Sequence, residues 1–162
     1  MHTWPLFQSV LLLTLANGTP VVAKRILRGR FAFPLDAGAR FFDGQPLLGP
    51  SKTIRGVVTS VVTTAVVARL LGLSFAAGGL VAALAMIGDL FSSFVKRRLK
   101  FASSSQAIGL DQVPESLLPL LVCQQMLSLT FVDVAVATGI FFLGELILSR
   151  LLYDLHLRDE PY

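Results

Sequence analysis

Residues 88–119, GDLFSSFVKRRLKFASSSQAIGLDQVPESLLP, place two aspartates on either side of a basic, serine-rich segment in an otherwise apolar chain. Asp89 lies deep inside a long apolar run, and Asp111 comes just before the next one. An ionised carboxylate in hydrocarbon needs a partner, which makes it a functional candidate by default. We therefore interpret this stretch as the active loop of an integral membrane enzyme.

The composition of the whole chain also indicates a membrane protein. Of the 162 residues, 54% are hydrophobic and 15% are charged, and the mean hydropathy is +0.71. A water-soluble domain of this length needs more polar surface. We predict an all-α, polytopic membrane protein that forms one unit over residues 1–162. The single cysteine and two histidines argue against a disulfide and a zinc site.

Five apolar segments of roughly 16–20 residues are each at the short end of what crosses ~30 Å of hydrocarbon. They cover residues 6–23, 56–71, 75–94, 114–132 and 134–153. In the first segment, Gly18 and Pro20 are expected to break the helix. Asn17 beside them has polar groups that need partners, either in an interhelical hydrogen bond or in the lining of a polar site.

The basic residues predict the topology. Eleven of the fourteen lie in two intervals, 24–55 and 96–100. The positive-inside rule places both loops, about 24–55 and 96–113, in the cytoplasm, with the N-terminus outside and the C-terminus inside. All the polar motifs, including the tail 155–162, then face the cytoplasmic side of the inner membrane. A transporter is disfavoured, because its site would lie near the midplane.

The first loop carries groups suited to phosphate. The helix that begins near Thr53 offers free N–H groups, and Lys52 and Arg55 flank its start. The segment Gly-Pro-Ser-Lys-Thr resembles the end of a Walker A loop. However, Lys52 follows a serine and no glycine stands where the motif requires the earlier one, so we reject a P-loop.

The residues that follow Asp89 extend its polar face. Ser93 and Lys96 come four and seven residues later, a helical spacing that points them the same way. The structural alternative for Asp89 is a buried ion pair, for which Arg150 near the inner end of the last segment is within reach. Glu145 in that segment is interpreted as a structural hydrogen-bonding group in preference to part of a substrate path.

Asp89 and Asp111 together offer two hard oxygen ligands of the kind that Mg²⁺ prefers, alongside phosphate oxygens and water. Asp111 alone could be only a helix-start signal. The nearby basic groups would neutralise a triphosphate, and phosphoryl-type transfer asks little more than such positioning and charge compensation. These groups are Lys52, Arg55, Lys96 and Arg97.

Five different motifs follow one another along the chain. They are A-N-x-x-P at 16–20, P-L-D-x-G-x-x-F-x-D-G-x-x-L-L-G at 34–49, K-T-x-R-G at 52–56, G-D-x-x-x-S-x-x-K-R-R at 88–98 and L-D-Q at 110–112. Their order resembles the CDP-archaeol synthase family, five-span relatives of the C-terminal part of phosphatidate cytidylyltransferases. The resemblance implies transfer of CMP from CTP to an isoprenoid ether-lipid phosphate, with release of pyrophosphate and a requirement for Mg²⁺.

The resemblance also implies roles for individual residues. Asp89 and Asp111 match the aspartates of the metal site, and together with Lys96 they are our catalytic candidates. The candidates for binding CTP or the lipid phosphate are Asn17, Asp36, Lys52, Thr53, Arg55, Ser93 and Arg97. The expected partners are CTP, the lipid phosphate and membrane lipids, without nucleic acid. The oligomeric state stays open, with a homodimer as one option.

Two alternatives remain at this point: the same chemistry on diacyl phosphatidic acid, and a non-catalytic module that binds anionic lipid. The sequence also departs from the family pattern in two places. Ile54 stands where an aromatic residue is expected after Lys-Thr, and the H-G-G-x-x-D-R-x-D segment of the wider family is reduced to G-L-D-Q at 109–112. The stretch A-S-S-S-Q-A at 102–107, followed by P-E-S-L-L-P at 114–119, resembles a divergent, bacterial-type branch of the family.

Overall fold

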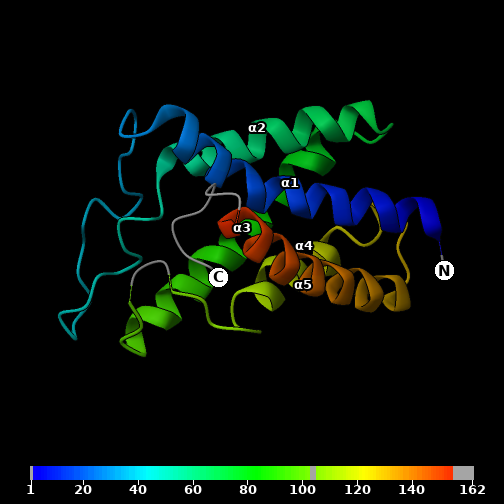
Figure 1. Ribbon diagram of the computed structural model, residues 1–162. Helices are drawn as coiled ribbons and strands as arrows, with labels where there is room; N and C mark the ends of the chain where they lie inside the picture. Colours follow the sequence, from blue (N-terminus) through cyan, green and yellow to red (C-terminus); the bar gives the residue numbers. More distant parts are fainter. Residues whose placement is uncertain (1, 103–104, 155–162) are drawn as a thin grey trace.

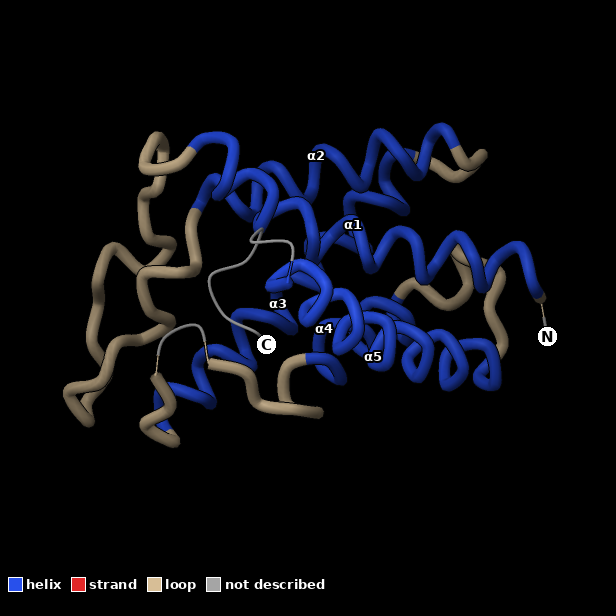
Figure 2. The backbone as a smooth tube through the Cα atoms, viewed as in Figure 1, coloured by secondary structure: helices blue, strands red, loops and turns tan. Residues whose placement is uncertain are grey.

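The computed structural model describes residues 2–102 and 105–154, and these residues form five α-helices (Figure 1). They are α1 (Thr3–Leu27), α2 (Ile54–Leu70), α3 (Phe75–Arg98), α4 (Gln112–Val122) and α5 (Phe131–Asp154). Successive helices run in opposite directions, and both long loops lie at one end of the bundle (Figure 2). We call this the basic end. The all-α prediction is confirmed, while the tail 155–162 lies outside the described residues.

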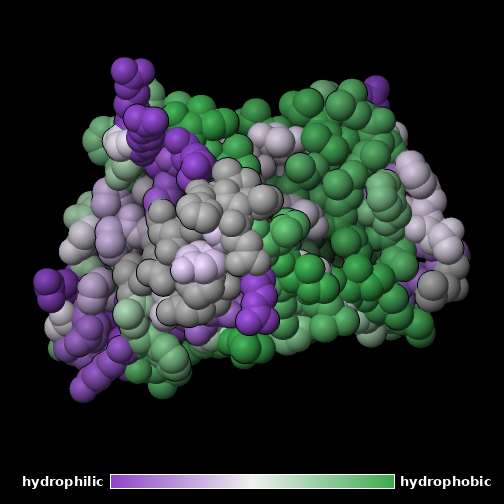
Figure 3. Space-filling view, in the orientation of Figure 1, coloured by the Kyte–Doolittle hydropathy of each residue, from purple (hydrophilic) through white to green (hydrophobic). Residues whose placement is uncertain are grey.

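Three of the described helices, α1, α3 and α5, are long and apolar enough to cross a membrane. On the face drawn in Figure 3, hydrophobic residues cover most of the bundle and hydrophilic residues gather at the basic end. Helix α2 has 17 residues, which corresponds to about 26 Å at ~1.5 Å per residue. The bundle therefore presents an apolar belt to the bilayer and one strongly polar end.

The fourth predicted segment, 114–132, is wrong in its length. Helix α4 has 11 residues, about 16 Å, and so covers only about half of the hydrocarbon thickness. Residues 123–128 form turns, and Ser128 adopts a left-handed backbone with φ 54°. The polar residues of the connection, Gln124, Gln125, Ser128 and Thr130, favour turns over a continued apolar helix.

The start of α5 also differs from the predicted segment 134–153, which leaves Asp133 outside. Asp133 instead lies in the first helical turn and forms a capping box with Thr130. The Asp133 N–H donates to Thr130 Oγ1 at 3.2 Å, and the Thr130 N–H donates to Asp133 Oδ2 at 3.0 Å. The helix therefore begins at Phe131, three residues earlier than expected.

The predicted break in α1 is absent, because the helix runs without interruption through Pro20. Proline has no N–H, so the carbonyl of Ala16, four residues earlier, loses its helical donor. Ser60 of α2 replaces it, since its hydroxyl donates to Ala16 O at 2.7 Å. A neighbouring helix thus supplies the hydrogen bond that hydrocarbon cannot.

Two glycines allow helices to cross closely and so place the site. A Cβ on Gly78 of α3 would lie 2.4 Å from the Ala68 Cβ of α2. A Cβ on Gly88 would lie 2.3 Å from the carbonyl oxygen of Pro114 in α4. The second contact is next to Asp89, so it brings this carboxylate against the start of α4, where Asp111 lies.

Candidate active site at the basic end

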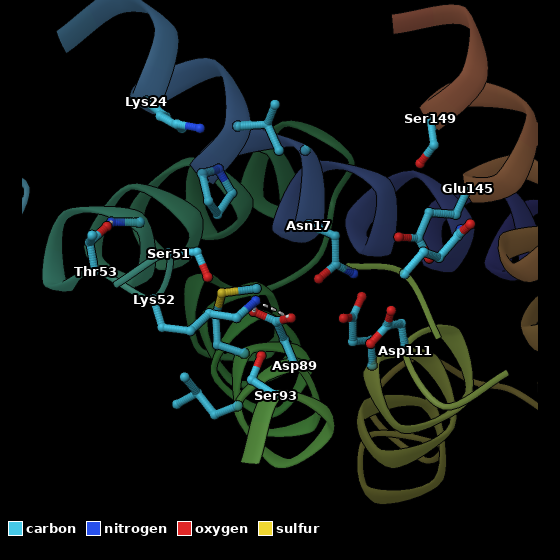
Figure 4. A pocket seen from close by; sticks show the side chains of 18 of the residues that line it. Asn17, Lys24, Ser51, Lys52, Thr53, Asp89, Ser93, Asp111, Glu145 and Ser149 are labelled. Atoms are coloured by element: carbon cyan, nitrogen blue, oxygen red, sulfur yellow. Dashed lines mark hydrogen bonds and ion pairs between the residues drawn. The ribbon is translucent and has the colours of Figure 1, made fainter. Parts of the chain in front are cut away.

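A cavity of about 1180 Å³ lies between the helices at the basic end (Figure 4). Nine of the ten predicted site residues line it, and they come from α1, the first loop, α2, α3 and the start of α4. These are Asn17, Lys52, Thr53, Arg55, Asp89, Ser93, Lys96, Arg97 and Asp111. The fold therefore brings together residues that are almost a hundred positions apart in the sequence.

Asp89 is held by a lysine from the first loop. The Lys52 ammonium lies 2.6 Å from both Asp89 carboxylate oxygens, and Figure 4 shows this pair inside the cavity. Burial by itself lowers the pKa of Lys52, but the combined effect of Asp89, Glu115 and Asp111 outweighs it and the pKa is raised. The ammonium therefore stays charged. The alternative of an ion pair between Asp89 and Arg150 is wrong, because Arg150 is exposed and the cation paired with Asp89 is Lys52.

Asp111 forms the second ion pair. Its Oδ1 lies 2.7 Å from the Lys96 ammonium, and its Oδ2 accepts the Ala107 N–H at 2.8 Å. The Lys96 ammonium also donates to the Ser105 carbonyl at 2.9 Å. The position of Lys96 relative to Oδ1 suits charge attraction but not a hydrogen bond, and this buried oxygen has no hydrogen-bond donor. Inside the cavity, this hard acceptor therefore has the Lys96 ammonium as its charge partner.

Two further cations are tied to backbone carbonyl groups. Arg55 is buried and donates to the carbonyls of Arg28 and Arg30, which fastens the start of the first loop to α2. Arg97 is also buried and donates to the Ala102 carbonyl at 2.8 Å. Both guanidinium groups line the cavity while they fix the backbone that surrounds it.

Three smaller groups complete the predicted set. Thr53 caps α2, and its Oγ1 accepts the Gly56 N–H at 3.2 Å. Ser93 is buried, whereas the hydroxyl of its neighbour Ser92 donates to the Leu110 carbonyl at 2.6 Å and ties α3 to the second loop. Asn17 lines the cavity, and its amide donates within α1 to Leu13 O at 3.2 Å. The bond that it makes is therefore local.

Asp36 is the exception, because it does not line the cavity. Its carboxylate accepts the backbone N–H groups of Gly38, Leu48 and Gly49 at 2.9–3.1 Å. Partial burial raises the pKa of Asp36, but these three donors outweigh it and leave the pKa below its ordinary value of 3.8. The geometry makes Asp36 an organiser of the loop that carries Lys52.

Sequence reasoning missed Glu115 as a site residue. This side chain is buried, lines the cavity and lies next to the Asp89 carboxylate. The available signal was spacing, since Glu115 comes four residues after Asp111 and hence on the same helical face. Glu145 also lines the cavity (Figure 4), where a purely structural role was expected.

The donor set fits a magnesium ion. Among the described residues, no group of three or more His, Cys, Asp or Glu is arranged to hold a metal ion by itself. Mg²⁺ needs only one or two carboxylates when phosphate oxygens and water complete its shell. Asp111 Oδ1 provides a buried oxygen without a hydrogen bond, and Asp89 already holds a cation, the Lys52 ammonium.

Cations and carboxylates buried in one cavity of an apolar helical bundle define a class of protein: an integral membrane enzyme that acts on phosphate groups. The chain matches the family model for CDP-archaeol synthase (CarS-like) over residues 6–77 and 73–162. It is 35% identical to the CDP-archaeol synthase of Thermofilum pendens, over 91% of this chain and 75% of that protein. For the CDP-archaeol synthase of Pyrobaculum aerophilum the identity is 31%, over 91% of both chains.

The fold has a relative among solved structures as well. An intramembrane enzyme of archaeal membrane lipid biosynthesis superimposes with a TM-score of 0.70 at 28% identity, over 85% of this chain and 90% of that one. The chain belongs to the CDP-archaeol synthase family. It is a multi-pass integral membrane protein and a CTP-dependent cytidylyltransferase of lipid biosynthesis. This outcome removes the alternative of a non-catalytic lipid-binding module.

Proposed function

We propose that this chain, acting as one unit, transfers CMP from CTP to the phosphate of an isoprenoid ether glycerol phosphate, and that Asp89 and Asp111 hold the Mg²⁺ ion the reaction uses. The observation that carries the proposal is the pairing of each carboxylate with a lysine inside one cavity of the apolar bundle. The bound metal would neutralise phosphate charge and orient the phosphates for in-line displacement.

Each lysine has a partner that a substrate can replace. When a triphosphate enters, Lys52 and Lys96 turn from the carboxylates to the phosphate oxygens, and the freed carboxylate oxygens become available to the metal. Arg55 and Arg97 hold the surrounding backbone and add positive potential. The lipid phosphate oxygen attacks the α-phosphorus, the bond between this phosphorus and the α,β-bridging oxygen breaks, and the β- and γ-phosphates leave together as pyrophosphate. No protein nucleophile is needed.

The remaining candidates have supporting roles. Ser93 and Asn17 line the cavity and offer a hydroxyl and an amide to substrate oxygens. Thr53 fixes the start of α2, and Asp36 orders the loop before Lys52. Glu115, next to Asp89, adds a further buried carboxyl group to this side of the cavity.

We propose that the basic end faces the cytoplasm, so that CTP reaches the cavity from water. The support is the concentration of eleven basic residues in the two loops at this end. A cysteine introduced at Phe42 should react with a membrane-impermeant maleimide in inside-out vesicles only. Cys123 is buried, so it should contribute little background. Reaction of Phe42→Cys in right-side-out vesicles would show that the basic end faces the outside and would overturn the proposed topology.

The activity test uses purified protein, CTP labelled at the α-phosphate, Mg²⁺ and two lipid phosphates, an isoprenoid ether and a diacyl ester. We expect the label to appear in a CDP-lipid with the ether substrate, with an equal amount of pyrophosphate. Chelation of divalent ions should stop the reaction, and added Mg²⁺ should restore it. Exclusive use of the diacyl lipid would overturn the lipid assignment, and full activity after chelation would overturn the metal assignment.

A further inference from the structure

The cavity has a second, apolar wall that the chemistry of the phosphates does not use. Opposite the ion pairs it is lined by α5 and α1, helices that both have the length and hydropathy of membrane spans. The apolar residues of this wall are Val21, Phe141, Ile147, Leu148 and Leu151, and the same two helices also contribute Asn17, Lys24 and Glu145 to the lining. A nucleotide has little apolar surface that requires such a wall, whereas a hydrocarbon chain is apolar along its whole length.

The apolar wall reaches the outside of the bundle. Ile147 and Leu151 line the cavity, yet their exposed fractions are 69% and 52%. Within the described residues, the cavity therefore extends to the surface beside α5. Figure 1 shows α1 and α5 next to each other along this side. Because both helices are candidate membrane spans, the opening faces hydrocarbon.

The opening and the ion pairs both lie toward the basic end. Ile147 comes seven residues before the end of α5 at Asp154, roughly 10 Å along the helix. Asp89 comes nine residues before the end of α3 at Arg98, roughly 14 Å. Both residues thus lie in the last three turns of helices that end on the basic side, so a lipid can enter sideways with its phosphate near the membrane interface and its tails in the leaflet.

Glycines on both helices keep this wall open. Gly18 of α1 and Gly144 of α5 line the cavity, and a Cβ added to either would meet nothing within 4 Å. They differ from Gly78 and Gly88, where a Cβ would collide with a neighbouring helix. A glycine inside a helix costs ~1 kcal/mol relative to alanine. At Gly18 and Gly144 the absence of a side chain does not bring two helices closer together; it leaves free space in the cavity.

We propose that the gap between α1 and α5, kept open by Gly18 and Gly144, is where the hydrocarbon tails of the lipid phosphate lie while its phosphate reaches the Lys52–Asp89 and Lys96–Asp111 pairs. This inference rests on the proposed function, whose lipid substrate it locates. It assigns the tails to the side of the cavity bounded by α1 and α5.

The test fills the gap without disturbing the ion pairs. Gly18→Leu and Gly144→Leu place side chains in open space, and Gly139→Leu is the matched control, because Gly139 lies on α5 in open space but does not line the cavity. Kinetics are measured with a long-chain isoprenoid ether glycerol phosphate and with a short-chain, water-soluble analogue.

For the two gap variants we expect KM for the long-chain lipid to rise about tenfold or more, equivalent to ~1.4 kcal/mol of lost binding. KM for CTP and turnover of the short-chain analogue should stay near wild type, as should all constants of Gly139→Leu. Unchanged long-chain kinetics in both gap variants, or an equal loss with both lipids, would overturn the proposal.

A photoreactive long-chain lipid phosphate separates this inference from the proposed reaction. In wild-type protein the label should be found by mass spectrometry on α1 and α5 around the gap, and Gly144→Leu should reduce it. That result would stand even if no CDP-lipid formed, in which case only the proposed reaction fails. Labelling confined to other helices would refute the gap as the site of the tails.

Discussion

Carboxylates at the two ends of the bundle are buried in different ways. At the end opposite the cavity, Asp133 is fully buried and accepts the N–H groups of His2 and Thr130 and the Thr130 hydroxyl at 2.8–3.1 Å. At the basic end, Asp89 and Asp111 bind lysine side chains, and one oxygen of Asp111 has no hydrogen bond.

The difference separates a structural carboxylate from one suited to a ligand. The donors from His2 and Thr130 saturate Asp133, so it needs nothing from solution. Lysine side chains are flexible and can exchange one anion for another. The pairs of Asp89 and Asp111 can therefore open toward a polyanion without unfolding any backbone. Neutralising a carboxylate should thus abolish activity at one end and affect mainly stability at the other.

The largest expected effect comes from Asp89→Asn and Asp111→Asn. Each should lower kcat by about 10²–10³-fold or more, the scale seen when a group that stabilises transition-state charge is lost. Asp133→Asn should keep kcat within about twofold, because it is remote from the cavity. The measurement is CDP-lipid formation at saturating CTP, with gel filtration as the check of folding. Full activity of both cavity variants would mean that the metal assignment is wrong.

The same contrast applies to the helices that carry these residues. Gly88→Ala should destabilise the protein by roughly 1–3 kcal/mol, because the added methyl group would lie against the Pro114 carbonyl and force α3 and α4 apart. Gly139→Ala, a helical glycine with open space around it, should be neutral or slightly stabilising. Thermal unfolding in detergent compares the two. Equal unfolding temperatures for Gly88→Ala and Gly139→Ala would show that α3 and α4 can move apart at their crossing without loss of stability.

The sequence predicted the polar site better than the paths of the helices around it. Apolar runs predict spans, but they could not show that Ser60 would rescue the carbonyl left by Pro20 and so keep α1 intact. Nor could they show that α4 would end at Val122. Both outcomes depend on a partner distant in sequence or on turn formation, which hydropathy does not encode.

Nine of the ten candidate residues line the cavity because their motifs all lie in the basic-side halves of helices or in the loops next to them. The sequence could not predict which of these residues form ion pairs with one another. Lys52 and Asp89 are 37 positions apart, and only the closed bundle decides that Lys52 and not Arg150 is the partner. Glu115 was predictable from its spacing to Asp111. Asp36 was predicted as a site residue from its motif, but its carboxylate binds backbone N–H groups of the first loop and does not line the cavity.

A smaller effect is expected at the cap of α5. Asp133→Ala removes the acceptor for the His2 and Thr130 N–H groups and breaks the capping box. The loss should be about 0.5–2 kcal/mol of stability, the usual range for an N-terminal cap. Asp133→Ser should recover part of it, because a hydroxyl can still accept one N–H. Hydrogen exchange of the first turn of α5 measures the loss, and activity per folded molecule should not change.

The smallest effect concerns the first loop, whose order depends on Asp36. Its pKa is lowered, because the backbone N–H groups of Leu48, Gly38 and Gly49 outweigh the opposing effect of burial. The folded loop thus prefers the carboxylate, and this contribution is fully present above the ordinary pKa of 3.8 and is lost as the pH falls through the lowered value.

Limited proteolysis of residues 34–49 with an acid-stable protease should therefore accelerate only below about pH 4 in wild-type protein. Asp36→Asn keeps one amide oxygen as an acceptor but has no charge, so its loop should be cut faster at every pH and should lose the acid dependence. Since the loop delivers Lys52 to Asp89, the same variant should raise KM for CTP severalfold with little change in kcat. A variant with wild-type proteolysis and KM would show that the loop holds Lys52 without Asp36.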